Sequence, residues 1–269
     1  MIFSEHRLLK LVKIGLYSAP VTIFVFYQSV FFPLVILKFV AFSIVAEIVA
    51  FFWLWLILFH PQYRLKKNVI VIAFFALVFV LTVVSLFAIS PHRSFWSVTD
   101  RFTGLISMWH FFLYFLMLYS VRRAINWRAY FTFLFLISIT VSLLAFVQKT
   151  VPGFLGGEHE RPGSLLGNPA YLAGYLLFTI FIGAYLARGS TGRLRLLYGI
   201  VILVEVIAIV LGNTRGAIIG LGLGAVVFQI VSAHARGWNS KNPYAAALVV
   251  LTLFVGIFLF TRQAALWQR

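Results

Sequence analysis

The chain has 269 residues, of which 62% are apolar and 10% are charged, and its mean hydropathy is +1.02. This composition excludes a water-soluble globular domain. The absence of cysteine excludes disulfide bonds and thiolate metal sites. A single aspartate, Asp100, argues against the paired carboxylates with which many nucleotide-sugar enzymes hold a metal ion. The sequence therefore predicts no metal and no cofactor.

Successive apolar runs approach the roughly 20 residues that an α-helix needs to cross a bilayer. In hydrocarbon the chain itself must satisfy every backbone polar group, so runs of this length predict helices. The predicted fold is all-α: a polytopic transmembrane helix bundle, in one domain over residues 1–269. The predicted spans lie at residues 9–28, 33–59, 68–89, 103–121, 131–148, 169–187, 196–212, 217–233 and 245–261.

The formal net charge of +16 is explained by membrane topology rather than by a nucleic-acid surface. With the N-terminus in the cytoplasm, 14 Lys and Arg residues fall in cytoplasmic segments and 7 in external ones, while Lys38 lies within the second span. A bias of this sign in short loops is the positive-inside pattern. We therefore expect a multi-pass protein with a cytoplasmic N-terminus, anionic membrane lipids as partners of the basic loops, and no nucleic-acid partner.

The longest external loop runs from residue 149 to residue 168, and its Pro and Gly content predicts turns rather than a helix. It ends in Asn168-Pro169, a strong helix start, because Asn caps a helix and Pro fits its first position. The amides of such a helix end favour an anion, and Arg161 lies a few residues upstream. The alternative is a polar surface loop with a solvated arginine.

A second external motif, Asn213-Thr214-Arg215-Gly216, separates two apolar runs. Either Asn213 or Thr214 can cap the following helix, which leaves Arg215 in its first turn, where a cation opposes the helix dipole. A snorkelling arginine is the alternative. Because Arg161 and Arg215 fall on the same side of the membrane, the sequence predicts an anion clamp between them.

Polar residues within or near the spans have more than one interpretation. Glu47, Glu205 and Lys38 can form a polar relay, or they can belong to an interhelical pair or lie at the membrane interface. His110 fits a packed polar residue rather than a catalyst. A ridge of small residues predicts close packing of the eighth span, at Gly216, Gly220 and Gly224.

The two external motifs occur together in a known family. The first runs from Arg161-Pro162-Gly163-Ser164 through Gly167-Asn168-Pro169 to Tyr171-Leu172-Ala173, and the second is Asn213-Thr214-Arg215-Gly216-Ala217. In order and spacing they resemble the O-antigen ligase and polymerase family. The resemblance implies a multi-helix membrane glycosyltransferase of the bacterial inner membrane, which transfers a glycan from undecaprenyl diphosphate to an acceptor without metal or nucleotide sugar.

The resemblance also implies that both arginines face the periplasm and bind the donor's diphosphate. The acceptor, lipid A-core or a similar glycan, would attack the donor's anomeric carbon with a sugar hydroxyl, and the arginines would stabilise the charge on the leaving diphosphate. The amide ends of the two helix starts add to the same pocket. The expected diphosphate-binding residues are Arg161, Arg215, Asn168, Asn213 and Thr214.

The chain departs from the family pattern in two ways. Ala170 and Thr214 replace an Asn and a Ser that are common in the family. The chain also stops at Arg269, where the resemblance places a large periplasmic loop with the acceptor-activating histidine, so we expect the first part of such an enzyme. His159 is the remaining candidate for a general base, because no other histidine lies near the motifs.

Several functions stay open at this point. O-antigen polymerases and protein O-glycosyltransferases share these motifs with the ligases. A transporter or flippase for an anionic lipid or solute is the alternative from another class. Transporters of this kind are commonly built from repeat-related halves, and the sequence offers no convincing second half.

Overall fold

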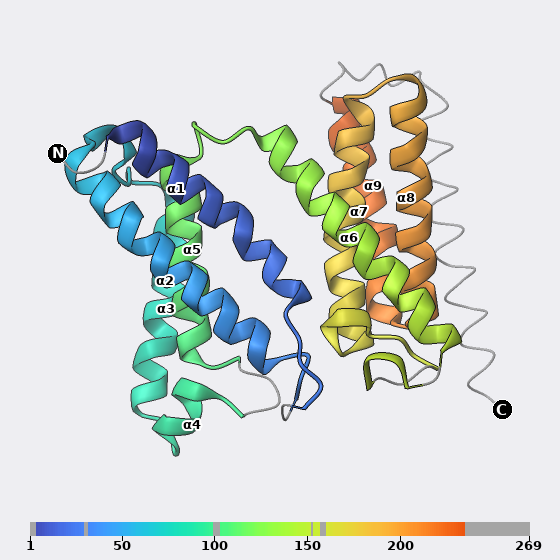
Figure 1. Cartoon of the computed structure of the whole chain (residues 1–269), viewed down its shortest axis with the longest axis horizontal. Coiled ribbons are helices and arrows are strands. Elements are labelled where there is room, and N and C mark those ends of the chain that lie inside the picture. Colours follow the sequence, from blue (N-terminus) through green and yellow to red (C-terminus); the bar gives the residue numbers. More distant parts are fainter. Residues whose placement is uncertain (1–3, 30–31, 99–102, 152, 157–159, 235–269) are drawn as a thin grey trace. The chain divides into compact units, whose positions relative to one another are not determined.

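The computed structural model describes residues 4–29, 32–98, 103–151, 153–156 and 160–234 (Figure 1). Within these residues every regular element is helical, which confirms the all-α membrane bundle. Six helices are long and apolar enough to cross a membrane: α2 (Ile36–Phe59), α3 (Val69–Leu86), α6 (Trp127–Thr150), α7 (Pro169–Arg188), α8 (Gly192–Leu211) and α9 (Arg215–His234). A shorter apolar helix, α5 (Leu105–Val121), and two further helices, α1 (Glu5–Ser18) and α4 (Pro91–Trp96), complete this set.

The predicted spans from 33–59 to 217–233 each coincide with one of these helices within a few residues. The first prediction, one helix over 9–28, is wrong, because α1 ends at Ser18 and a 3₁₀ helix, η1 (Ala19–Phe24), follows. Pro20 cannot donate a backbone hydrogen bond to the preceding turn. The Ser18 and Thr22 hydroxyls also donate to backbone carbonyls three residues before them. The predicted span 245–261 lies outside the described residues.

Helix α3 shows why this fold belongs in a membrane. Val78 is its one buried residue, whereas Val69 is 80% and Ile70 is 66% exposed. A continuous apolar surface of this kind is unfavourable in water and is the normal outer face of a membrane helix. The bilayer therefore takes the place of a protein partner along α3.

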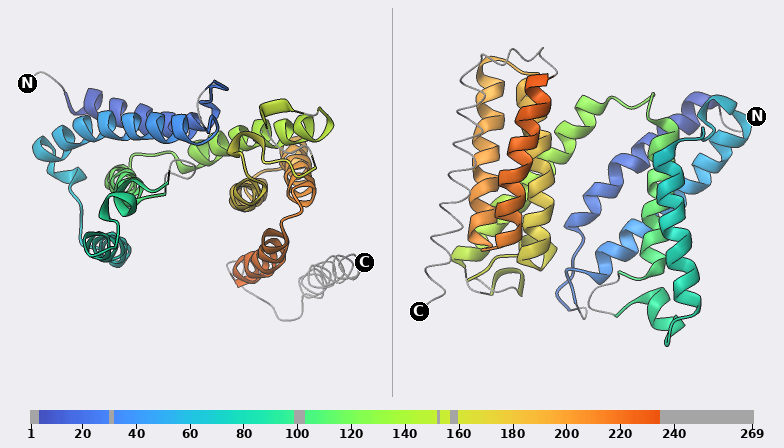
Figure 2. Two further views of the ribbon diagram at one scale, coloured as in Figure 1. Left: turned by 90° about the horizontal axis from the view of Figure 1, so that it is seen from below. Right: turned by 180° about the vertical axis from the view of Figure 1, so that it is seen from behind.

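The contacts within the chain form two compact units, Met1–Tyr130 and Phe131–Arg269, which we call unit 1 and unit 2. The prediction of a single domain stays a prediction. In unit 1, α1 lies beside α2, and α2 and α3 pack on α5 (Figure 2). In unit 2, α7 packs against both α8 and α9, and the three helices run side by side (Figure 1).

Polar residues inside the spans pair locally. In unit 1, Glu47 Oε1 on α2 lies 3.0 Å from His110 Nε2 on α5. In unit 2, the Ser138 hydroxyl on α6 donates to Glu205, a fully buried residue of α8. Lys38 donates to the Leu34 carbonyl at 2.8 Å. The two glutamates thus have separate partners on neighbouring helices, as in the interhelical-pair interpretation, and His110 is a packed polar residue as predicted.

Close packing in unit 2 depends on small residues. A Cβ on Gly220 would lie 3.2 Å from Leu177, and one on Gly224 would lie 2.5 Å from the Phe181 ring, both on α7. The predicted glycine ridge is therefore a packing face at these two positions, whereas Gly216 has open space.

Gly183 on α7 tests this packing. Gly183→Ala is expected to lower the free energy of unfolding by about 1–3 kcal/mol, measured by thermal or denaturant unfolding in detergent. The reason is that the added Cβ would lie 2.4 Å from the ring of Phe135. That ring is only 2% exposed and cannot move away. Gly174→Ala in the same helix is the matched control, because nothing lies within 4 Å of its Cβ. Equal loss of stability in both variants would contradict the packing.

Candidate functional site

The loop before α7 is anchored inside unit 2 rather than lying on its surface. Residues 162–165 are buried, and Ser164 is fully buried. The backbone N–H of Ser164 donates to Gln148 Oε1 at 2.7 Å, and its hydroxyl donates to the Val141 carbonyl at 2.6 Å. Both acceptors lie on α6. The alternative of a plain polar surface loop is therefore wrong for these residues, although Arg161 itself is exposed.

The start of α7 forms as predicted. Asn168 caps the helix, with its Oδ1 accepting from the Ala170 N–H at 2.8 Å, and Pro169 is the first helical residue. Gly163 packs on this cap so closely that a Cβ would lie 2.5 Å from the Asn168 nitrogen. Only glycine permits this approach, so the loop folds back over the helix start.

Arg161 reaches the turn between α8 and α9. Its Nε donates to the Gly212 carbonyl at 3.3 Å, and Gly212 is the C-cap residue that follows α8. The Thr214 hydroxyl donates to the same carbonyl, also at 3.3 Å. Because α9 begins at Arg215, this hydrogen bond brings Arg161 to the segment that carries the second arginine. The α7 start and the α8–α9 turn lie at the same end of unit 2 (Figure 1).

The two arginines at this end lie in different settings. Both are exposed. The Nε of Arg161 is held by the Gly212 carbonyl, but among the described residues its terminal nitrogens have no carboxylate partner. Arg215 occupies the first position of α9, where a bound anion would offset the unfavourable interaction of its charge with the helix dipole.

The other predicted ligands have structural roles. The Asn168 side-chain oxygen caps α7 by accepting from the Ala170 N–H. That N–H, which we expected to face the anion, therefore already has a hydrogen-bond acceptor. Thr214 is at the cap position of α9, because its carbonyl accepts from the Ala217 and Ile218 amides. Its hydroxyl donates to Gly212 instead of capping. Asn213 is exposed with a φ of 48°, a left-handed conformation that Asn tolerates. His159 lies outside the described residues.

Gln148 and Ser164 position this site, although no sequence pattern predicted this role. A buried amide at the last residue of a predicted span was the available signal, since it needs a polar partner. Lys149 adds a second link, because its Nζ donates to the Glu160 carbonyl at 2.8 Å. The loop is thus held by α6 on one side and by the α8–α9 turn on the other.

Gln148→Met is expected to lower the free energy of unfolding by about 1–3 kcal/mol, because it leaves the buried Ser164 N–H without an acceptor. Denaturant unfolding in detergent measures the change. Thr150→Val is the matched control on the same helix, because the exposed Thr150 hydroxyl bonds only to carbonyls of its own turn. If both variants unfold alike, Gln148 does not anchor the loop.

Cysteine labelling tests which end of unit 2 faces outward. Ser164 and Ser190, on opposite ends, are both buried and are poor labelling positions, whereas Glu160 and Thr191 are exposed. The chain has no cysteine of its own. With the orientation predicted by the basic residues, an impermeant thiol reagent added to intact cells should label Glu160→Cys but not Thr191→Cys. The opposite pattern would invert the topology.

The structure establishes a helical membrane protein in which Arg161 is bonded to the turn that precedes Arg215. No known protein family, curated protein sequence or solved structure matches this chain. The membrane fold is therefore established from the chain itself, and the function of the two arginines is inferred from their geometry and chemistry.

Proposed function

We propose that this chain is the donor-binding part of a membrane glycosyltransferase that transfers a glycan from undecaprenyl diphosphate to an acceptor sugar hydroxyl at the periplasmic face, as O-antigen ligases do. One observation carries this function: the Arg161 Nε donates to the Gly212 carbonyl, two residues before Thr214 and three before Arg215. Two arginines from separate helix starts therefore gather at one end of a membrane-spanning unit.

The chemistry of a lipid-linked diphosphate suits this arrangement. Guanidinium groups bind phosphate oxygens through two parallel hydrogen bonds, and two of them match the two phosphates of the donor. Because the site lies at the end of apolar helices, the isoprenoid chain of the donor can stay in the bilayer while the diphosphate of the donor contacts the arginines. The α7 and α9 starts add the positive ends of their dipoles at the same place.

The transfer reaction requires stabilisation of the leaving group. As the acceptor oxygen bonds to the anomeric carbon, the bond from that carbon to the diphosphate oxygen breaks, and the diphosphate gains negative charge. Arg161 and Arg215 stabilise that charge without a metal ion. A general base takes the hydroxyl proton of the acceptor, such as lipid A-core.

Arg215→Lys is expected to weaken binding of undecaprenyl diphosphate to the chain in nanodiscs by about tenfold or more, because lysine keeps the charge but cannot make the two parallel hydrogen bonds. Arg161→Lys should behave alike. The matched control is Arg193→Lys, an exposed arginine in the first turn of α8, at the opposite end of unit 2. Binding is measured against undecaprenyl monophosphate as the reference ligand.

Unchanged affinity in both Arg161→Lys and Arg215→Lys, or an equal loss in Arg193→Lys, would remove the diphosphate site. The transporter alternative makes another prediction. It would be favoured if vesicles that contain the chain move the lipid diphosphate across their membrane and no glycan is transferred. O-antigen polymerases and protein O-glycosyltransferases use the same donor chemistry, so the choice of acceptor in a transfer assay separates them from ligases.

A further inference from the structure

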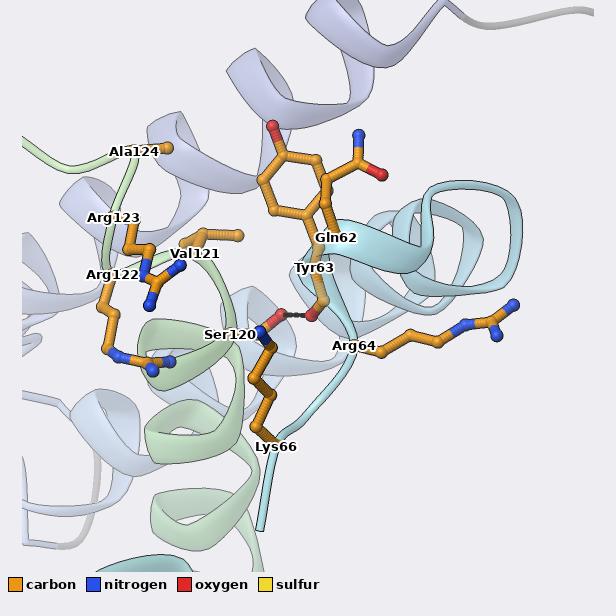
Figure 3. A pocket seen from close by; sticks show the side chains of 9 residues that line it. All are labelled: Gln62, Tyr63, Arg64, Lys66, Ser120, Val121, Arg122, Arg123 and Ala124. Atoms are coloured by element: carbon orange, nitrogen blue, oxygen red, sulfur yellow. Dashed lines mark hydrogen bonds between the residues drawn. The ribbon is translucent and has the colours of Figure 1, made fainter. Parts of the chain in front are cut away.

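A second basic site lies in unit 1 and shares no residue with the proposed diphosphate site. A pocket of about 280 Å³ opens where the segment after α2 meets the end of α5 (Figure 3). No carboxylate lines it. Its lining residues are Gln62, Tyr63, Arg64, Lys66, Ser120, Val121, Arg122, Arg123 and Ala124.

Two of its four basic residues stabilise helix ends. Arg64 donates from Nε and Nη2 to the Ile57 and Leu58 carbonyls at 3.1 and 3.2 Å, and so caps the last turn of α2. Arg122 donates to the Tyr119 carbonyl at 2.7 Å and stacks 3.8 Å over the Tyr119 ring at the end of α5. Both charges therefore offset the negative ends of helix dipoles, which would otherwise repel an anion here.

The other two basic residues have no such role. Lys66 and Arg123 are exposed, and among the described residues neither has a carboxylate or carbonyl partner. Figure 3 shows both side chains extending into the pocket, whereas Arg64 extends away from it. The pocket wall is held in place by the Ser120 hydroxyl, which donates to the Tyr63 carbonyl. Two uncompensated cations thus face one preformed hollow.

An acidic residue is bonded to the pocket wall but does not line the pocket. Glu5 accepts a hydrogen bond from the Tyr63 hydroxyl at 3.0 Å and is not among the lining residues. Hydrogen bonds from Gln62 and Tyr63 hold the pKa of the Glu5 carboxyl below its usual value, so it is ionised at neutral pH. In Figure 3 the Tyr63 hydroxyl points away from Lys66, so the carboxylate it binds lies outside the hollow.

The position and size of the pocket indicate the kind of ligand. It lies at the ends of two apolar helices, α2 and α5, and Trp127 at the same end donates from its indole to the Arg122 carbonyl at 2.9 Å. Tyr and Trp at helix ends are typical of the headgroup level of a membrane. Its volume of about 280 Å³ is below the roughly 300–1,000 Å³ of sites that enclose a whole drug-sized ligand. A headgroup fits, and its acyl chains would stay in the bilayer.

We propose that this pocket binds the phosphodiester headgroup of an anionic phospholipid, with Lys66 and Arg123 contacting the phosphate. Basic pockets between membrane helices on the cytoplasmic side bind such headgroups in general, and the distribution of basic residues predicts that this end is cytoplasmic. The site is independent of the diphosphate site, because the two lie in different units and share no residue.

The test uses the full chain, purified in detergent and stripped of lipid. Short-chain phosphatidylglycerol and phosphatidylcholine are titrated, and bound lipid is counted by native mass spectrometry. K66Q/R123Q should weaken phosphatidylglycerol binding about tenfold or more. The matched control, K67Q/R7Q, removes the same charge from two exposed residues of unit 1 that do not line the pocket, and should stay within about twofold. The charge-conserving K66R/R123K should retain binding, and circular dichroism checks that each variant is folded.

Three outcomes would overturn the lipid site. An equal loss in K66Q/R123Q and K67Q/R7Q would mean general attraction to a basic surface. Phosphatidylcholine binding as tightly as phosphatidylglycerol would mean that net headgroup charge is irrelevant. Inorganic phosphate that displaces phosphatidylglycerol and binds without it would identify a soluble phosphate site instead. If K66Q/R123Q does not fold, the same comparisons are made with R123Q alone against R7Q.

Discussion

Every backbone polar group of a membrane chain needs a partner within the protein, and the non-helical ends of the spans depend on that constraint. Within a helix the backbone groups bond to one another. At the helix ends and in the loops, side chains supply the missing partners: Gln148 accepts from the Ser164 amide, and Asn168 accepts from the Ala170 amide. At helix C-termini, Arg64 and Arg122 donate to carbonyls of the last turn. These hydrogen bonds fix the described loop residues to the helix ends beside them.

The same constraint separates structural arginines from arginines that can bind a ligand. Arg188 on α7 donates to Ser232 on α9 and joins two helix ends, so its charge is already used in packing. Arg161 combines both functions, because its Nε completes the α8–α9 turn while its terminal nitrogens remain at the surface. Counting basic residues therefore does not by itself identify a ligand site. What identifies a candidate ligand residue is a cation whose charge no helix end requires.

The two basic sites differ in electrostatic setting. The site in unit 2 lies at the N-terminal ends of α7 and α9, where the helix dipoles attract an anion and assist the arginines. The pocket in unit 1 lies at the C-terminal ends of α2 and α5, where the dipoles repel an anion. Two arginines there donate hydrogen bonds to carbonyls of the helix ends, and two further cations line the pocket. An anion site at helix C-termini therefore needs more basic residues than one at N-termini.

The sequence by itself determined the membrane class, most of the spans and the cap at Asn168, because apolar length and capping chemistry are local properties of the chain. Only the tertiary structure decided that residues 162–165 are buried, that Gln148 holds their backbone, and that Arg161 bonds to Gly212. These contacts join residues 16 and 51 positions apart. No local pattern encodes them, because they depend on how α6, α7 and α8 pack, and that packing follows from the shapes of side chains at crossings such as Gly183 against Phe135.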